Sequence, residues 1–229
     1  INQSGFYIGC HQDLTQVDLE YIVELFGRYG RQQLKKVGEG ATLILVTKNS
    51  EALLKEIWDR IPFELFAQVI AFDEASTDRT GEILVQEGVP VVEANGRSML
   101  ELACLDESGV EHENLVFYPV DGRHDVRNIA RLLFILERGN DMAVASRFIV
   151  GGERKIPGHP SRYRSIGNRI FNLLANLLFY GNISDSVTYF RAVKRSKIAA
   201  LKLHGRGMPL NYRLSIRAMK KGWRVSEIP

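Results

Sequence analysis

The sequence has few cysteines, no long apolar run and little net charge, and each shortage excludes a class of protein. The 229 residues contain two cysteines, Cys10 and Cys104, far apart and in no metal-ligand spacing. They therefore indicate neither a disulfide framework nor a zinc site. No segment reaches the roughly 18 apolar residues of a membrane-spanning helix. The formal net charge of +3 does not indicate a nucleic-acid-binding protein. We expect a reduced, cytoplasmic setting.

The length suits one large α/β domain or two small ones, and the hydrophobic and charged fractions, 45% and 25%, are ordinary for a globular protein. The first 40 residues differ from the rest. Residues 16–36 carry apolar side chains at helical spacing, and Gly38 and Gly40 follow. We expect an N-terminal helical extension over residues 1–40 and a second domain over residues 41–229.

The second domain opens with alternating strand and helix patterns. Strands are expected at 42–46, 68–72, 89–93, 115–119 and 142–145, and helices at 50–60, 77–87, 98–105 and 126–138. The later pattern predicts helices at 165–180, 196–203 and 212–221, and strands at 185–191 and 223–228. This alternation is typical of a mostly parallel sheet. Ligands bind such sheets beyond the carboxyl ends of the strands, which directs attention to the residues after Val46, Phe72 and Val120.

Two of these strand ends carry acidic residues. Asp73 and Glu74 are followed by Ser-Thr-Asp (residues 76–78) at the start of a helix. Carboxylates there can accept hydrogen bonds from ribose hydroxyls or a base N–H, while the free backbone donors of the helix receive an anion. The simpler alternative is that Ser76 is an N-cap and the acids favour the helix dipole. The later segment, Asp121 to Asp125, fits a phosphate or metal site, or a turn built on Asp-Gly.

Six segments in order resemble the family 2 glycosyltransferases, especially the branch that makes polyprenyl-phosphate sugars. The segments are LILVTKNSEALLKEI, AFDEASTDRT, PVDGRHD, ASRF, RSIGNRIFNLLANLLF with SDSVTYFRAVKRS, and SIRAMKKGWRVSEIP. The resemblance covers about residues 42–229. It implies an α/β fold of the GT-A type, with a mostly parallel twisted sheet flanked by helices. It also implies sugar transfer, with inversion, from a nucleotide diphosphate sugar.

The resemblance also assigns residues to the donor. The nucleotide sugar would be held by Thr47, Asn49, Asp73, Glu74, Ser76, Asp78 and Asp121. Thr47 and Asn49 would shape the nucleotide pocket, and Asp121 would lie near the diphosphate.

The metal motif departs from the family pattern. That pattern has two acids separated by one residue, and here the first position is Pro119, so that Asp121 alone remains. Arg123 lies two residues after Asp121. Magnesium needs oxygen ligands in near-octahedral geometry, and a Mg or Mn ion held mainly by Asp121 would be weakly bound. Arg123 can stabilise the leaving diphosphate instead, which gives the hypothesis of metal-independent chemistry. Loss of catalysis, leaving a nucleotide-sugar-binding pseudoenzyme, is the competing interpretation.

The acceptor side is basic. On the resemblance, an acceptor phosphate would be bound by Arg147, Arg162, Arg164, Asn168 and Arg169, beside an apolar helix at 170–179. The alternatives are a solvated basic loop and a core helix. A polyprenyl phosphate at an anionic membrane surface fits the charge and the apolar stretch. We therefore expect a cytoplasmic protein that works at the inner face of the membrane.

The acceptor decides whether a base is needed. A polyprenyl phosphate is already an anion, whereas a glycan hydroxyl must lose a proton. Asp185 is the candidate base for a hydroxyl acceptor, and its simpler role is capping or pairing with Arg191. The proposed catalytic set is thus Asp121, Arg123 and Asp185. His124 could bond the diphosphate, but a structural role in its turn is favoured.

Overall fold

The structure is a computed structural model that describes residues 27–28, 40–149, 162–179, 181, 183–203 and 209–229. The expected helical extension lies almost entirely outside the described residues, so the boundary at residue 40 stays a prediction.

The described chain alternates strands and helices before a more irregular second half. The first half contains β1 (Ala41–Thr47), α2 (Glu51–Ile57), β2 (Gln68–Asp73), α3 (Thr80–Gln86), β3 (Val91–Glu93), α4 (Met99–Leu102), β4 (Asn114–Pro119), α5 (Asn128–Glu137) and β5 (Met142–Ala145). Three short 3-10 turns lie at Trp58–Arg60, Phe63–Leu65 and Asp106–Ser108. The second half contains α6 (Arg162–Phe179), β6 (Arg191–Lys194), α7 (Arg195–Ala200), α8 (Pro209–Lys220) and β7 (Val225–Ile228).

The seven described strands form one sheet in the order β3-β2-β1-β4-β6-β5-β7. Strand β1 pairs in parallel with β2 and with β4, and β5 pairs in parallel with β7. Strand β6 runs antiparallel between β4 and β5. The carboxyl ends of β2, β1 and β4 therefore lie side by side at one edge, where Thr47 is in register with Asp73 and Val46 with Pro119.

Helices cover both faces of the sheet. One buried cluster joins β1 side chains such as Leu43 to α2, α3 and α5, and the other joins side chains such as Ile44 to α4, α7 and α8. All seven residues of β1 are buried, as expected for a central strand packed on both faces. The expected mostly parallel α/β sheet flanked by helices is confirmed.

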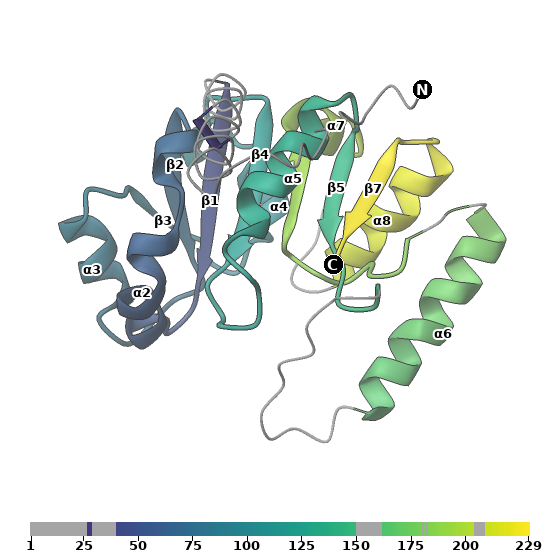
Figure 1. Cartoon of the computed structure of the whole chain (residues 1–229), viewed down its shortest axis with the longest axis horizontal. Helices are drawn as coiled ribbons and strands as arrows, with labels where there is room; N and C mark the ends of the chain where they lie inside the picture. The colour runs from purple at the N-terminus through teal and green to yellow at the C-terminus, as the bar shows by residue number, and fades with distance from the viewer. Residues whose placement is uncertain (1–26, 29–39, 150–161, 180, 182, 204–208) are drawn as a thin grey trace, which may run out of the picture.

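Helix α6 stands away from the sheet at the lower right of Figure 1 and contacts α8. Its inward side makes an aromatic contact, with Phe171 edge-on to Tyr212 of α8. It also makes polar contacts: Asn172 donates to the Ser184 carbonyl at 2.5 Å, and Asn176 bonds both backbone groups of Ile183 at 3.0 Å. In the described part of the chain, no helix is long and apolar enough to cross a bilayer.

The strand expected at 185–191 is wrong, because pairing begins only at Arg191. The segment before it bonds through side chains instead. Phe190 donates its backbone N–H to the Thr188 hydroxyl, and the buried Arg191 guanidinium donates to the Thr188 carbonyl. Such local bonds give the backbone an alternative to a sheet ladder. The other expected strands and helices are confirmed with shifted ends. The helix ends shift by up to three residues; α3, for example, begins at Thr80 rather than at residue 77.

Candidate functional site: an acidic edge and an arginine-lined cavity

Asp73, at the end of β2, organises the loops at the sheet edge. Its carboxylate is 6% exposed and accepts three hydrogen bonds. The Thr47 hydroxyl donates at 2.7 Å, and Ser76 donates from its hydroxyl at 2.6 Å and its backbone N–H at 2.7 Å. Ser76 is not the N-cap of α3, a position that Arg79 occupies. The expected donor residues Thr47, Asp73 and Ser76 are thus brought together, bonded to one another.

The loops after β1 and β2 are also tied to each other. The Asn49 backbone N–H donates to the Ser76 hydroxyl at 2.8 Å. The side-chain oxygen of Asn49 accepts from the Thr77 backbone N–H, also at 2.8 Å. Asp78 accepts from the Glu51 N–H at 3.1 Å and from the Thr80 N–H at 3.0 Å. Asn49 has a positive φ of 49°, a conformation that asparagine tolerates better than most residues. Asn49 and Asp78 therefore join the two loops.

Glu74 and Asp121 are the acids at this edge that keep carboxylate oxygens available. Glu74 is half-buried, and only its backbone N–H is bonded, to the Thr47 carbonyl at 2.9 Å. Asp121 is exposed and accepts the Arg123 N–H at 3.0 Å. Neither carboxylate forms an ion pair with another described residue. Val120 holds the Asp121 turn against β1, because its N–H donates to the Val46 carbonyl at 2.9 Å.

His124 follows in the same turn, and the pKa of its imidazole is lowered. Burial lowers the pKa of its imidazole, and the charge of Asp121 offsets this only in part. The ring meets Phe190 edge-on with centroids 5.2 Å apart, and the Tyr118 hydroxyl donates to the His124 carbonyl at 3.3 Å. These contacts agree with a structural role in the turn.

Asp185 pairs with Arg147 and not with Arg191. The Asp185 side chain is fully buried, and Arg147 donates to it from Nε at 2.7 Å and from a terminal nitrogen at 3.0 Å. Burial raises the pKa of the Asp185 carboxyl, but the hydrogen bonds from Arg147 outweigh burial and the pKa is lowered. A carboxylate bonded in this way is a poor general base.

Two of the arginines expected to bind the acceptor phosphate lie near Phe148. The guanidinium carbons of Arg147 and Arg169 lie 5.5 Å and 5.7 Å from the centre of the Phe148 ring. The side chains of Arg162, Arg164 and Asn168 lie outside the described part of the chain. Of the expected acceptor group, Arg147 and Arg169 are therefore the two whose side chains are placed together.

Glu227 was missed by sequence reasoning, yet it fixes the Asp185 loop. Its carboxylate accepts the Ser184 N–H at 2.9 Å and the Asp185 N–H at 3.1 Å. The signal was present in the Glu-Ile-Pro triplet at residues 227–229, where an acid stands at the carboxyl end of the last strand.

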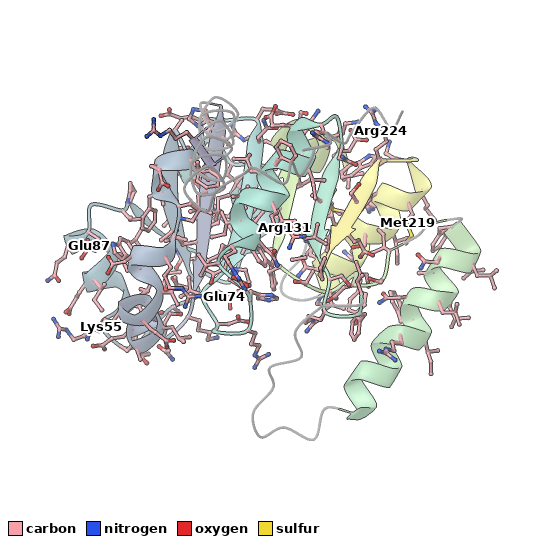
Figure 2. The ribbon with its side chains drawn as sticks, viewed as in Figure 1. Lys55, Glu74, Glu87, Arg131, Met219 and Arg224 are labelled. Atoms are coloured by element: carbon pink, nitrogen blue, oxygen red, sulfur yellow. The ribbon has the colours of Figure 1, made fainter. Side chains whose placement is uncertain are left out.

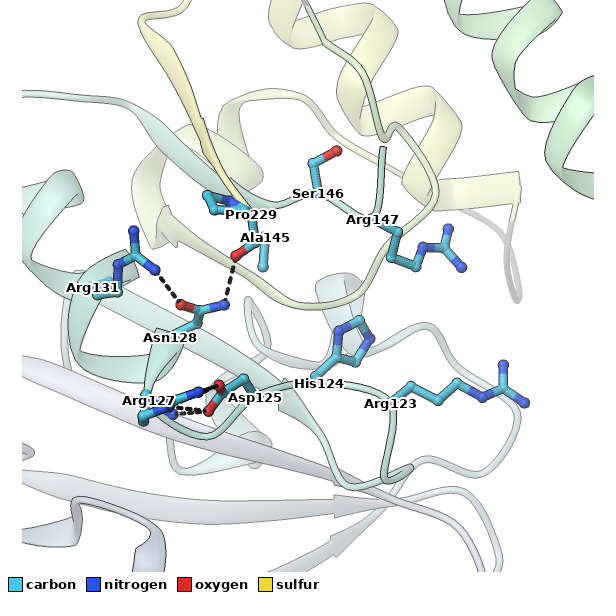
Figure 3. A pocket seen from close by; sticks show the side chains of 10 residues that line it. All are labelled: Arg123, His124, Asp125, Arg127, Asn128, Arg131, Ala145, Ser146, Arg147 and Pro229. Atoms are coloured by element: carbon cyan, nitrogen blue, oxygen red, sulfur yellow. Dashed lines mark hydrogen bonds and ion pairs between the residues drawn. The ribbon is translucent and has the colours of Figure 1, made fainter. Parts of the chain in front are cut away.

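A cavity of about 490 Å³ opens beside these residues (Figure 3). It lies between the turn after β4, the start of α5, and the ends of β5 and β7. The lining residues are Arg123, His124, Asp125, Arg127, Asn128, Arg131, Ala145, Ser146, Arg147 and Pro229. Four arginines and one aspartate give the lining an excess of positive charge, which suits anionic groups.

The donor set at the edge does not fit a metal ion held by the protein. The strand-end position before Val120 is Pro119, which has no side-chain oxygen, and Asp125 is engaged by Arg127. Among the described residues, no three His, Cys, Asp or Glu side chains gather in a way that could hold a metal. In the turn at residues 121–125, Asp121 is therefore the one carboxylate that is not engaged in an ion pair.

Comparison with solved structures decides the fold. The structure superposes on glucosyl-3-phosphoglycerate synthase from Mycobacterium tuberculosis, which was solved with Mn²⁺, UDP and glucosyl-3-phosphoglycerate. The TM-score is 0.63 and the sequence identity 18%, and the match covers 85% of this chain and 71% of the synthase chain. The chain has the GT-A glycosyltransferase fold.

Curated relatives of this chain include a glycosyltransferase and a polyprenol monophosphomannose synthase. It is 22% identical to glycosyltransferase AglJ of Haloferax volcanii, over 83% of this chain and 62% of that protein. It is 26% identical to polyprenol monophosphomannose synthase of Mycolicibacterium smegmatis, over 70% of this chain and 64% of that protein. The chain thus spans less than two thirds of the length of each. No family model matches the chain. The expected resemblance to glycosyltransferases is confirmed.

Proposed function

We propose that this GT-A domain transfers a sugar from a nucleotide diphosphate sugar to a polyprenyl phosphate at a membrane surface. The observation that carries the proposal is the place of Arg147 and Arg169, which share Phe148 beside the apolar face of α6. A basic pair next to exposed apolar side chains suits an anionic headgroup with a hydrocarbon tail. The relative named as a polyprenol monophosphomannose synthase supports this acceptor.

In this reaction an acceptor phosphate oxygen attacks the anomeric carbon, and the bond from that carbon to the nucleoside diphosphate breaks with inversion. The leaving diphosphate keeps the electron pair, and no proton has to be removed from the acceptor. The pairing of Asp185 with Arg147 is consistent with this, because the carboxylate nearest the acceptor side is not free to act as a base.

We expect a nucleoside diphosphate to lie over the linked loops after β1 and β2, with Glu74 accepting hydrogen bonds from its hydroxyl or base N–H groups. Arg123, which has no carboxylate partner among the described residues, is proposed to stabilise the charge that develops on the leaving diphosphate. Asp121 would orient Arg123 through the bond to its backbone N–H.

A turnover assay tests the proposal. The protein is incubated with short-chain polyprenyl phosphate and a panel of uridine and guanosine diphosphate sugars, and products are measured by mass spectrometry. We expect a glycosylated polyprenyl phosphate, and a raised KM for the acceptor in Arg147→Gln. Arg138→Gln, at the C-cap of α5 and outside the cavity, is the control. Binding of a nucleotide sugar without turnover would instead support a pseudoenzyme.

The proposed role of Arg123 has its own test. Because the diphosphate charge is met by Arg123 rather than by a metal, activity should persist in excess chelator and fall by about a hundredfold in Arg123→Ala. Loss of activity on chelation, restored by Mn²⁺ or Mg²⁺, would contradict this assignment while leaving the transferase function intact.

A further inference from the structure

The cavity extends past the residues that the proposed reaction uses. Figure 3 shows Arg123 and Arg147 at one end and Arg131 at the other, beside Asn128 and Pro229. In the proposed reaction, Arg123 faces the leaving diphosphate and Arg147 faces the acceptor phosphate. A sugar passing between them would occupy the space between these two arginines, and Arg131 lines the opposite end of the same cavity.

Arg131 is held at its end of the cavity by a short relay. One terminal nitrogen donates to the side-chain oxygen of Asn128 at 3.0 Å, and the Asn128 amide donates to the Pro229 carbonyl at 2.8 Å. Asn128 is 8% exposed. A guanidinium has five N–H donors, so Arg131 keeps the others for a ligand, in the planar fork that matches a carboxylate.

Arg131 is exposed to solvent, and the cavity lining offers it no free carboxylate. The lone acid of the lining, Asp125, is engaged by Arg127 at 2.5 Å, and Arg147 is engaged by Asp185 from outside the cavity. Arg123 and Arg131 have no carboxylate partner among the described residues. A sugar bound over Arg131 displaces water from its guanidinium. A hydroxyl replaces that water with a neutral hydrogen bond, whereas a carboxylate replaces it with stronger charge-assisted bonds.

We propose that the transferred sugar is a uronic acid, and that Arg131, oriented by Asn128, selects it by binding the sugar carboxylate. The inference rests on the proposed transfer from a nucleotide diphosphate sugar and names the donor class. Arg131 would be a specificity-determining residue rather than part of the bond-forming machinery.

The test uses donor pairs that differ at carbon 6 alone: UDP-glucuronic acid with UDP-glucose, and GDP-mannuronic acid with GDP-mannose. Dissociation constants are measured by calorimetry on the full chain. We expect the acidic member of one pair to bind at least about tenfold more tightly, the scale of one charge-assisted hydrogen bond. Arg131→Gln should lose that preference without weakening the neutral donor. Arg131→Lys should retain part of it.

Arg138→Gln is the control, since it removes the same charge at the C-cap of α5, outside the cavity, and should keep the full preference. Equal affinity for both members of each pair would overturn the inference, and so would a preference that survives in Arg131→Gln or that Arg138→Gln also removes. Transfer from a neutral donor, with no preference for the acidic donor, would support the proposed transferase function but contradict the uronic acid inference. If no nucleotide sugar binds, both fail.

Discussion

Three aspartates near the carboxyl edge of the sheet differ in what surrounds their carboxylates. Asp73 is saturated by hydroxyl and backbone donors, Asp185 is paired with Arg147, and Asp121 is exposed with oxygens available. One residue type therefore serves as a loop organiser, an ion-pair partner and a site that ligands can reach. Sequence reasoning placed all three in the site, but the division of roles depends on partners that lie far away along the chain.

Asp185→Asn should change stability in a pH-dependent way. The folded pKa of Asp185 lies below its usual value of 3.8, so the stabilisation is present above about pH 4 and is lost as the pH falls through the folded pKa. At neutral pH the variant should be destabilised by about 1–3 kcal/mol. Its free energy of unfolding should also fall less steeply than that of the wild type between pH 5 and pH 3. Denaturant titrations across this range measure both effects, and parallel curves would contradict the assignment.

The same variant separates the two acceptor classes. With a phosphate acceptor no proton is removed, and Asp185→Asn should keep turnover within about tenfold of the wild type once stability is corrected for. A collapse of kcat by three orders of magnitude or more would instead indicate a hydroxyl acceptor and a general base.

At the scale of elements, α6 turns Asn172 and Asn176 toward the protein and leaves much of its apolar surface exposed. Six large apolar side chains are 37–72% exposed: Ile170, Phe171, Leu173, Leu174, Leu177 and Leu178. Figure 2 shows side chains along this helix projecting away from the fold. A helix with an exposed apolar face and a basic start is suited to lie at a lipid interface.

Leu173→Glu with Leu177→Glu should therefore weaken binding to vesicles that contain anionic lipid. Loss of apolar burial and repulsion from the surface act together, and we expect at least a tenfold weaker partition in a sedimentation assay. Val85→Glu is the control, because Val85 is 65% exposed on α3, far from α6 along the chain. Equal loss in the control, or none in the double variant, would contradict membrane contact through α6.

The strands and helices could be predicted from the sequence, but the orientation of α6 and the partners of several buried polar groups could not. The buried runs of β1, β2 and β4 were predictable, because strands covered on both faces are continuously apolar. The apolar stripe of α6 predicted a helix but not its orientation, which Asn172 and Asn176 decide by bonding the 183–186 segment. Likewise Glu227 gains its role from the backbone of the distant 184–185 segment, and Asn128, the partner of Arg131, from Pro229. A single sequence carries no signal of such pairings.

At the scale of the molecule, ligand binding should raise the melting temperature. A nucleoside diphosphate at a hundred times its dissociation constant adds about 2.7 kcal/mol, or roughly 5–10 °C for a domain of this size. Because the residues at the edge do not fit a protein-held metal, the rise for the preferred nucleotide should be the same with chelator present. A thermal shift series over uridine, guanosine and adenosine diphosphates measures it. A rise seen only with added Mn²⁺ would contradict metal-independent binding.

The insertion of β6 between β4 and β5 has a consequence for biosynthesis. Strand β5 leaves the ribosome before either of its neighbours, β6 and β7, has been made. A nascent chain that ends between residues 146 and 190 can complete the β3-β2-β1-β4 half but leaves β5 with two unpaired edges. Because unpaired strand edges invite association with other chains, stalled or truncated products of this length should be the ones that chaperones retain.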